Sequence, residues 1–155
     1  VAALSDTTSW RTCNGVFYLL NAPTGTADVA VTFPSTTTNR VDNRHAGAMV
    51  LYGAAQAAPE AIASAGADAT TNPIVTSIVA TTPQALIVDV VTQGDTGSFA
   101  PTEIGQIEWW ETSCGSSSSA TSIREAAGPG SLPLGWSHTS ARRYAHALAA
   151  FRPAP

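Results

Sequence analysis

The chain has 155 residues, of which 44% are hydrophobic and only 12% are charged, and its formal net charge at pH 7 is −4. This length suits one domain with a substantial core, so we expect a single domain over residues 1–155. The acidic balance argues against a nucleic-acid partner, because phosphate backbones are held by basic patches. No apolar run approaches the ~20 residues of a membrane-spanning helix, so we expect no membrane span.

Short apolar segments recur along the chain, most of them with alternating apolar residues, and these patterns predict β-strands. The first is the continuous apolar run Val16–Leu20, which we expect to be a central strand. In the next, Ala27–Phe33, the side chains of Val29, Val31 and Phe33 share one face. Further strands are expected at residues 46–52, 74–80, 85–91, 106–112, 132–138 and 144–151.

Glycine and proline turns separate these segments, and the spacing predicts an all-β fold: an antiparallel β-sandwich or jelly roll of about eight to ten strands. The alanine-rich residues 53–69 favour helix by propensity, but Gly53, Pro59 and Gly66 interrupt them. One helical turn near residues 54–58 stays open as an alternative. The four serines at 116–119 are expected to form an exposed loop.

Two cysteines, Cys13 and Cys114, are separated by most of the chain and fit no metal-binding or redox spacing. Both sit among polar residues, which is a poor setting for a buried thiol. We therefore expect a disulfide between Cys13 and Cys114, with two unrelated thiols as the alternative. A disulfide implies an oxidising compartment, so the chain is expected to be extracellular or on the cell surface.

Four blocks stand out in order: FYLLNAPTGTADVAVTF at 17–33, GAMVLYG at 47–53, ALIVDVV at 85–91 and RYAHALAAFRPA at 143–154. Together they resemble a widespread family of bacterial extracellular β-sandwich (jelly-roll, lectin-like) modules. The resemblance spans nearly the whole chain, and its motifs are structural rather than chemical. Family members carry further strands ahead of the position that corresponds to Val1. The resemblance therefore implies unpaired strand edges that another strand must fill.

Two acidic features of the sequence are candidate catalytic groups. Glu108 and Glu111 lie three residues apart on a predicted strand, so they should point to opposite faces and fail as a glycosidase pair. Asp89 alternates with Ile87 and Val91, and if it is buried it must accept hydrogen bonds. We interpret Asp89 as a structural acid and expect no catalytic residues.

The four tryptophans are the candidate ligand-binding residues, because exposed indoles stack on sugar rings. They are Trp10, Trp109, Trp110 and Trp136, and the alternative is that three of them pack in the core. Trp109 and Trp110 should alternate faces, with one of them buried. His45, His138 and His146 lie far apart, so no metal site and no cofactor are expected.

These observations lead to two main functional hypotheses, with a glycan-cleaving enzyme as a distant third. The first is a non-catalytic structural or adhesive subunit of a bacterial surface assembly or filament, whose partners are other copies of itself or a strand from another chain. The second is a carbohydrate-binding module that holds a glycan on exposed tryptophans. Enzymatic activity is not expected in either case.

Overall fold

The computed structural model describes residues 2–5, 12–33, 43–69, 72–140 and 142–155. Within these ranges every regular element is a β-strand, in agreement with the all-β prediction. In chain order the strands are β1 (Ala2–Ser5), β2 (Thr12–Gly15), β3 (Ala61–Ala67), β4 (Ile74–Ala80), β5 (Leu86–Gln93), β6 (Phe99–Pro101), β7 (Ile107–Cys114), β8 (Ser117–Glu125), β9 (Gly130–His138) and β10 (Tyr144–Phe151).

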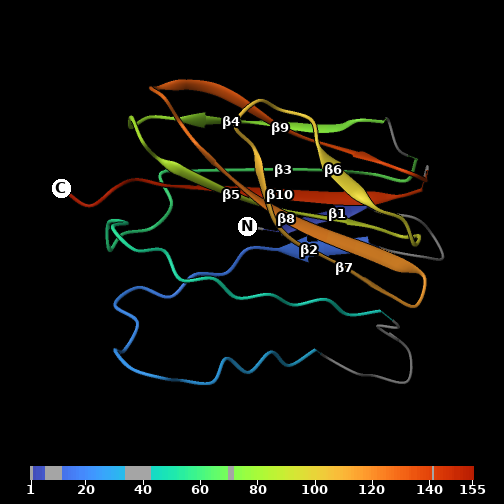
Figure 1. The fold of residues 1–155 in the computed structure, drawn as a ribbon, viewed down its shortest axis with the longest axis horizontal. Helices are drawn as coiled ribbons and strands as arrows, with labels where there is room; N and C mark the ends of the chain where they lie inside the picture. Colours follow the sequence, from blue (N-terminus) through green and yellow to red (C-terminus); the bar gives the residue numbers. More distant parts are fainter. Residues whose placement is uncertain (1, 6–11, 34–42, 70–71, 141) are drawn as a thin grey trace.

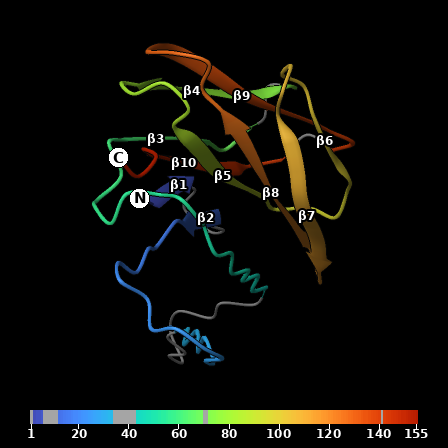
Figure 2. The same cartoon turned by 60° about the vertical axis from the view of Figure 1, so that its left-hand side comes forward.

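Two antiparallel sheets pack face to face and form the predicted β-sandwich. The five-stranded sheet has the order β3-β10-β5-β8-β7, and the three-stranded sheet has the order β4-β9-β6. The hairpin of β1 and β2 lies against the other face of the five-stranded sheet, over β3, β10 and β5. Figures 1 and 2 show this stacking, with the three-stranded sheet and the β1–β2 hairpin on opposite faces of the five-stranded sheet.

The hydrophobic core fills the space between the two sheets, where every second side chain of each strand points inward. One cluster gathers Ile78, Ile87, Leu134 and Leu148. A second, toward the other end of the strands, is built around Trp136, which meets the ring of Phe99 edge to face at 5.8 Å. Strand β4 shows the alternation most clearly, with buried and exposed residues following one another along its whole length.

The strands predicted in the second half of the chain are confirmed. β4 and β10 match the predicted residues 74–80 and 144–151, and β5, β7 and β9 differ only at their ends. The three earlier predictions, at 16–20, 27–33 and 46–52, are wrong, because the structure assigns none of these segments to a strand. A strand persists only beside a partner that completes its ladder, and neither sandwich sheet includes these residues.

Two further expectations are corrected. The serine run is only partly an exposed loop: Ser116 lies in an exposed turn, but Ser117, Ser118 and Ser119 are buried on β8 between β5 and β7. The alanine-rich region holds no helical turn. Instead Ala54 forms an isolated bridge with Pro153, and the alanines of β3 pair with β10. Alanine's helix preference is weak, and the ladder offered by β10 outweighs it.

Candidate functional site

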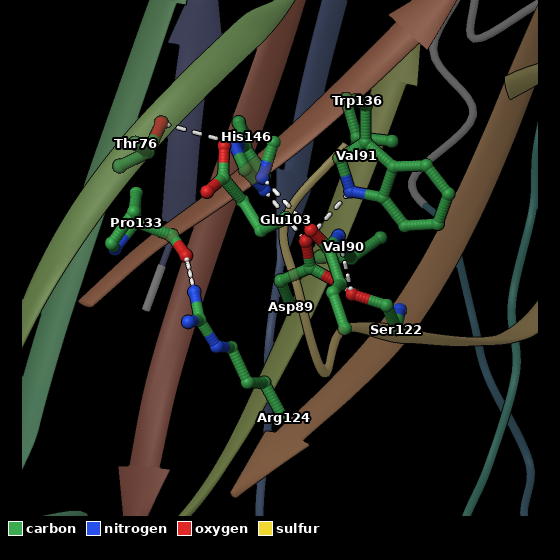
Figure 3. A network of polar contacts seen from close by, with 12 residues as sticks. Thr76, Asp89, Val90, Val91, Glu103, Ser122, Arg124, Pro133, Trp136 and His146 are labelled. Atoms are coloured by element: carbon green, nitrogen blue, oxygen red, sulfur yellow. Dashed lines mark hydrogen bonds and ion pairs between the residues drawn. The ribbon is translucent and has the colours of Figure 1, made fainter. Parts of the chain in front are cut away.

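A buried polar network surrounds Asp89 at the centre of the sandwich (Figure 3). Oδ1 of Asp89 accepts hydrogen bonds from the backbone N–H and the hydroxyl of Ser122, each at 2.6 Å. Oδ2 accepts from Nε1 of Trp136 at 2.7 Å and from Nε2 of His146 at 2.8 Å. The predicted hydrogen bonding of a buried Asp89 is therefore confirmed.

The network joins strands of both sheets. Asp89 lies on β5 directly opposite Ser122 of β8, whereas Trp136 comes from β9 in the other sheet. His146 on β10 extends the chain of contacts, since its Nδ1 lies 2.9 Å from the hydroxyl of Thr76 on β4. Gln106 adds a further link, because its amide donates to the Ser122 hydroxyl at 2.9 Å. The Asp89 carboxylate thus links the two sheets by hydrogen bonds, at a position where apolar side chains would otherwise pack.

Thr76, His146 and Asp89 follow one another as hydroxyl, imidazole and carboxylate, which is the order of a hydrolase triad. The setting differs from an active site. Asp89 and His146 are completely buried, and Thr76 is only 7% exposed. A substrate must reach the hydroxyl for such a triad to act, and here the packed core of the sandwich surrounds it. We interpret the network as a structural one that fixes how the two sheets pack.

The structure separates the four candidate tryptophans. Trp136 is completely buried and bonded to Asp89, so its assignment as a carbohydrate-binding residue is wrong. Trp110 is half-buried, and its indole packs so closely on Gly47 that a Cβ there would not fit. Trp109 is 56% exposed on β7, and Trp10 lies outside the described residues. Trp109 is therefore the one described tryptophan with an indole available to a ligand.

The expected geometry of Glu108 and Glu111 is also corrected. A β-bulge lies between Glu108 and Trp110, and it shifts the register of β7 by one residue. As a result Glu108 pairs with Ser122 and Glu111 with Ala120, which share one face of β8. Both carboxylates therefore lie on the same face. Glu111 is occupied as the acceptor of the Phe99 N–H at 3.0 Å, so the two do not form a free acid–base pair.

The predicted disulfide is absent, because Cys13 and Cys114 are both free thiols exposed at the surface. Cys13 points away from the sheet, since Asn14 next to it turns inward and donates to the carbonyl of Val90 at 3.0 Å. Cys114 ends β7, and β8 separates that strand from β5, on which β2 packs. Two strand spacings are about 9–10 Å, beyond the ~7 Å that a disulfide spans between Cα atoms.

The histidines occupy separate environments. His45 meets the Ser117 hydroxyl at 2.7 Å, and His138 packs beside Phe99 with a ring separation of 5.8 Å. Burial lowers the pKa of both histidines. Within the described ranges, no three or more histidine, cysteine or acidic side chains gather closely enough to hold a metal ion. In the same part of the chain, no helix has the length and apolar character needed to cross a membrane.

The most unusual surface is the N-terminal apolar segment, which we define as residues 16–33 and 43–52. It runs outside the two sandwich sheets and forms the extended part below them in Figure 2. Tyr18 anchors it at one end by an edge-to-face contact with Phe151 at 6.3 Å. Large apolar side chains project from it into solvent, and they are Phe17, Tyr18, Leu19, Leu20, Val29, Val31, Val50 and Tyr52.

A shallow apolar hollow lies where this segment leaves the sandwich. Val16 and Tyr18 line one side of it, and Ile62 of β3 and Ala149 of β10 line the other. The hollow thus adjoins the outer strand of the five-stranded sheet. It contains no charged side chain, which suits an apolar side chain better than a polar ligand.

Comparison with known proteins does not identify the chain, since no family model, curated protein or solved structure matches it. The resemblance to extracellular sandwich modules therefore stays a prediction.

Proposed function

We propose that the chain is a non-catalytic structural or adhesive subunit of a bacterial surface assembly or filament, and that it acts outside the cell. The observation that carries this proposal is the N-terminal apolar segment. Soluble monomers rarely expose a contiguous apolar patch larger than a few hundred Å², and larger patches mark interaction sites. Here the exposed aromatic and aliphatic side chains lie along two described stretches of backbone, residues 16–33 and 43–52.

The sequence pattern of this segment supports a β-type contact. Its apolar residues are continuous in Val16–Leu20 and alternate in Ala27–Phe33, as in buried and half-buried strands respectively. Such a stretch gains both main-chain hydrogen bonds and apolar burial when it joins the edge of another sheet. The partner we propose is another copy of this chain, because it supplies both the segment and the sheets that receive it.

Carbohydrate binding is the weaker alternative. Among the described tryptophans it rests on Trp109 alone, since Trp136 is buried and Trp110 packs on Gly47. A single exposed indole provides only one stacking platform for a sugar ring. A glycan array probed with the wild type and Trp109→Ala tests this alternative directly.

Self-association tests the main proposal. The molar mass in solution, followed by light scattering or analytical ultracentrifugation, should rise with concentration. The double variant Phe17→Ser/Leu19→Ser should stay monomeric, because both side chains lie exposed in the segment. Ile104→Ser is the matched control, since Ile104 is equally exposed but lies outside the segment, between β6 and β7. A wild type that remains monomeric at millimolar concentration contradicts the proposal.

A further inference from the structure

The two sides of the sandwich differ in how their edge strands are protected. Figure 2 shows β6 and β7 on one side and β3 and β4 on the other. β7 carries Glu108 and Glu111 and contains a bulge, while β6 has only three residues and ends at Pro101. Charges, bulges, proline and short length are the devices by which natural proteins stop an edge strand from pairing with another chain.

None of these devices is present on the opposite side. β3 and β4 have seven residues each, and their sequences AIASAGA and IVTSIVA contain no charged residue and no proline. Both pair without a register shift, β3 with β10 and β4 with β9. Within the described part of the chain, no strand lies beyond either of them. This side therefore offers two regular, uncharged edges whose outward backbone groups are available for pairing.

The chain also contains a segment that suits such an edge. The segment Ala27–Phe33 has the same length as β3, and along it apolar side chains alternate with small or polar ones. Val29 and Val31 are 72% and 55% exposed, so their face of the segment is uncovered. β3 alternates in the same way: Ala61 and Ala63 pack on the core, and Ile62 and Ser64 face outward.

From this match we infer that the β3 edge accepts Ala27–Phe33 of a second copy as an added strand, which deepens and rests on the proposed self-assembly. Val29 and Val31 then lie beside Ala63 and Ala65, on the face of β3 that packs toward the core, and Asp28 stays in solvent. One contact thereby covers the exposed valines and pairs the unprotected edge. Edge-to-edge pairing of β3 with the β3 of a second copy would leave the valines exposed, so the segment is the better occupant.

The pairing is heterologous, because the donor segment and the acceptor edge are different surfaces of one chain. Each copy that donates a strand still has its own β3 edge free. Contacts of this kind close into a ring or continue as an open filament, according to the rotation between neighbours. A symmetric dimer would instead saturate both surfaces at once.

Cross-linking between two single-cysteine variants tests the pairing. In a Cys13→Ser/Cys114→Ser background, Ala30→Cys and Ser64→Cys each place a thiol at the centre of its segment. Central residues meet whether the added strand runs parallel or antiparallel. Mixing the two proteins under mild oxidation should give a disulfide-linked heterodimer. The control Thr112→Cys, exposed on the protected β7 edge, should not cross-link with Ala30→Cys.

Charge at the edge supplies a second measurement. Ser64→Lys should weaken self-association about tenfold or more, because an edge lysine opposes strand addition, whereas Thr112→Lys should leave it unchanged. Circular dichroism confirms that each variant keeps its strands. Self-association with no Ala30–Ser64 cross-link and no effect of Ser64→Lys overturns the β3 pairing but leaves the proposed assembly standing. A cross-link formed within one chain by the double variant Ala30→Cys/Ser64→Cys overturns pairing between copies.

Discussion

Nε2 of His146 lies 2.8 Å from Oδ2 of Asp89, and both side chains are completely buried. A carboxylate oxygen can only accept, so Nε2 donates and the imidazole is held in one orientation. The Trp136 indole donates to the same oxygen at 2.7 Å. Oδ2 is therefore the atom through which β10 of one sheet and β9 of the other are joined to β5.

Removing the carboxylate should destabilise the fold strongly. In Asp89→Ala the donors of Ser122, Trp136 and His146 are left buried without an acceptor, at about 1–3 kcal/mol each. We expect the free energy of unfolding to fall by at least about 3 kcal/mol, measured by urea denaturation followed by circular dichroism. Asp68→Ala, at an exposed position just after β3, is the control and should change it by less than about 0.5 kcal/mol. Equal stabilities for the two variants would refute the structural role of the network.

The same substitution should lower stability at Trp136 but not at Trp109. Trp136→Phe keeps an aromatic ring but removes the Nε1 donor to Asp89, and we expect a loss of about 1–3 kcal/mol in stability. Trp109→Phe should leave stability within about 0.5 kcal/mol of the wild type, because its indole is exposed. Thermal melting of both variants makes the comparison, and a Trp136→Phe protein as stable as Trp109→Phe would contradict it.

Both cysteines should react without reductant. Because Cys13 and Cys114 are exposed and cannot meet, native protein treated with iodoacetamide should carry two carbamidomethyl groups by intact mass. The same treatment after reduction and unfolding provides the reference. A native protein that takes up no label until it is reduced would instead support the disulfide between Cys13 and Cys114 within one chain. Dimers that disappear on reduction would instead place the bond between copies.

Stability should fall in acid through Glu60. Desolvation opposes ionisation, but hydrogen bonds from the Thr82 hydroxyl and the N–H groups of Thr81 and Thr82 lower the pKa of Glu60. Because the pKa of Glu60 is lower in the folded state, its ionised carboxylate stabilises the fold at pH values above the ordinary pKa of glutamate, about 4.3. That contribution is lost as the pH falls from there through the folded-state pKa. Denaturation at pH 7 and pH 3 should show a smaller difference for Glu60→Gln than for the wild type. Glu125→Gln, at an exposed position, is the control, and an unchanged pH dependence in Glu60→Gln would disprove the assignment.

Much of the sandwich could be predicted from the sequence. β4 buries every second side chain and β10 buries nearly all of its side chains, and both patterns are strong in the sequence. The failures have a common physical reason. Val16–Leu20 has a strand's composition, but strand formation also depends on a neighbour that local pattern does not reveal. The converse holds for β3 and the serine-rich start of β8, which become strands because β10, β5 and β7 flank them.

The candidate site was only partly foreseeable. A polar residue within an apolar strand signalled Asp89, and His146 within β10 carried the same signal. Their meeting with Trp136 depends on how two sheets pack, which spacing along the chain does not encode. The face shared by Glu108 and Glu111 was missed because a single inserted residue reverses the alternation, and nothing in the local sequence marks that bulge.

The interior of β8 has a thermodynamic consequence. Six consecutive residues there, Ser117–Ser122, are buried, and all but Ala120 carry hydroxyl groups. Exposure of apolar surface raises the heat capacity on unfolding, whereas exposure of polar surface lowers it. The chain should therefore unfold with a heat-capacity increment below the ~12–15 cal/mol/K per residue of ordinary domains. Its stability then varies little with temperature, and the fold loses little of it on cooling.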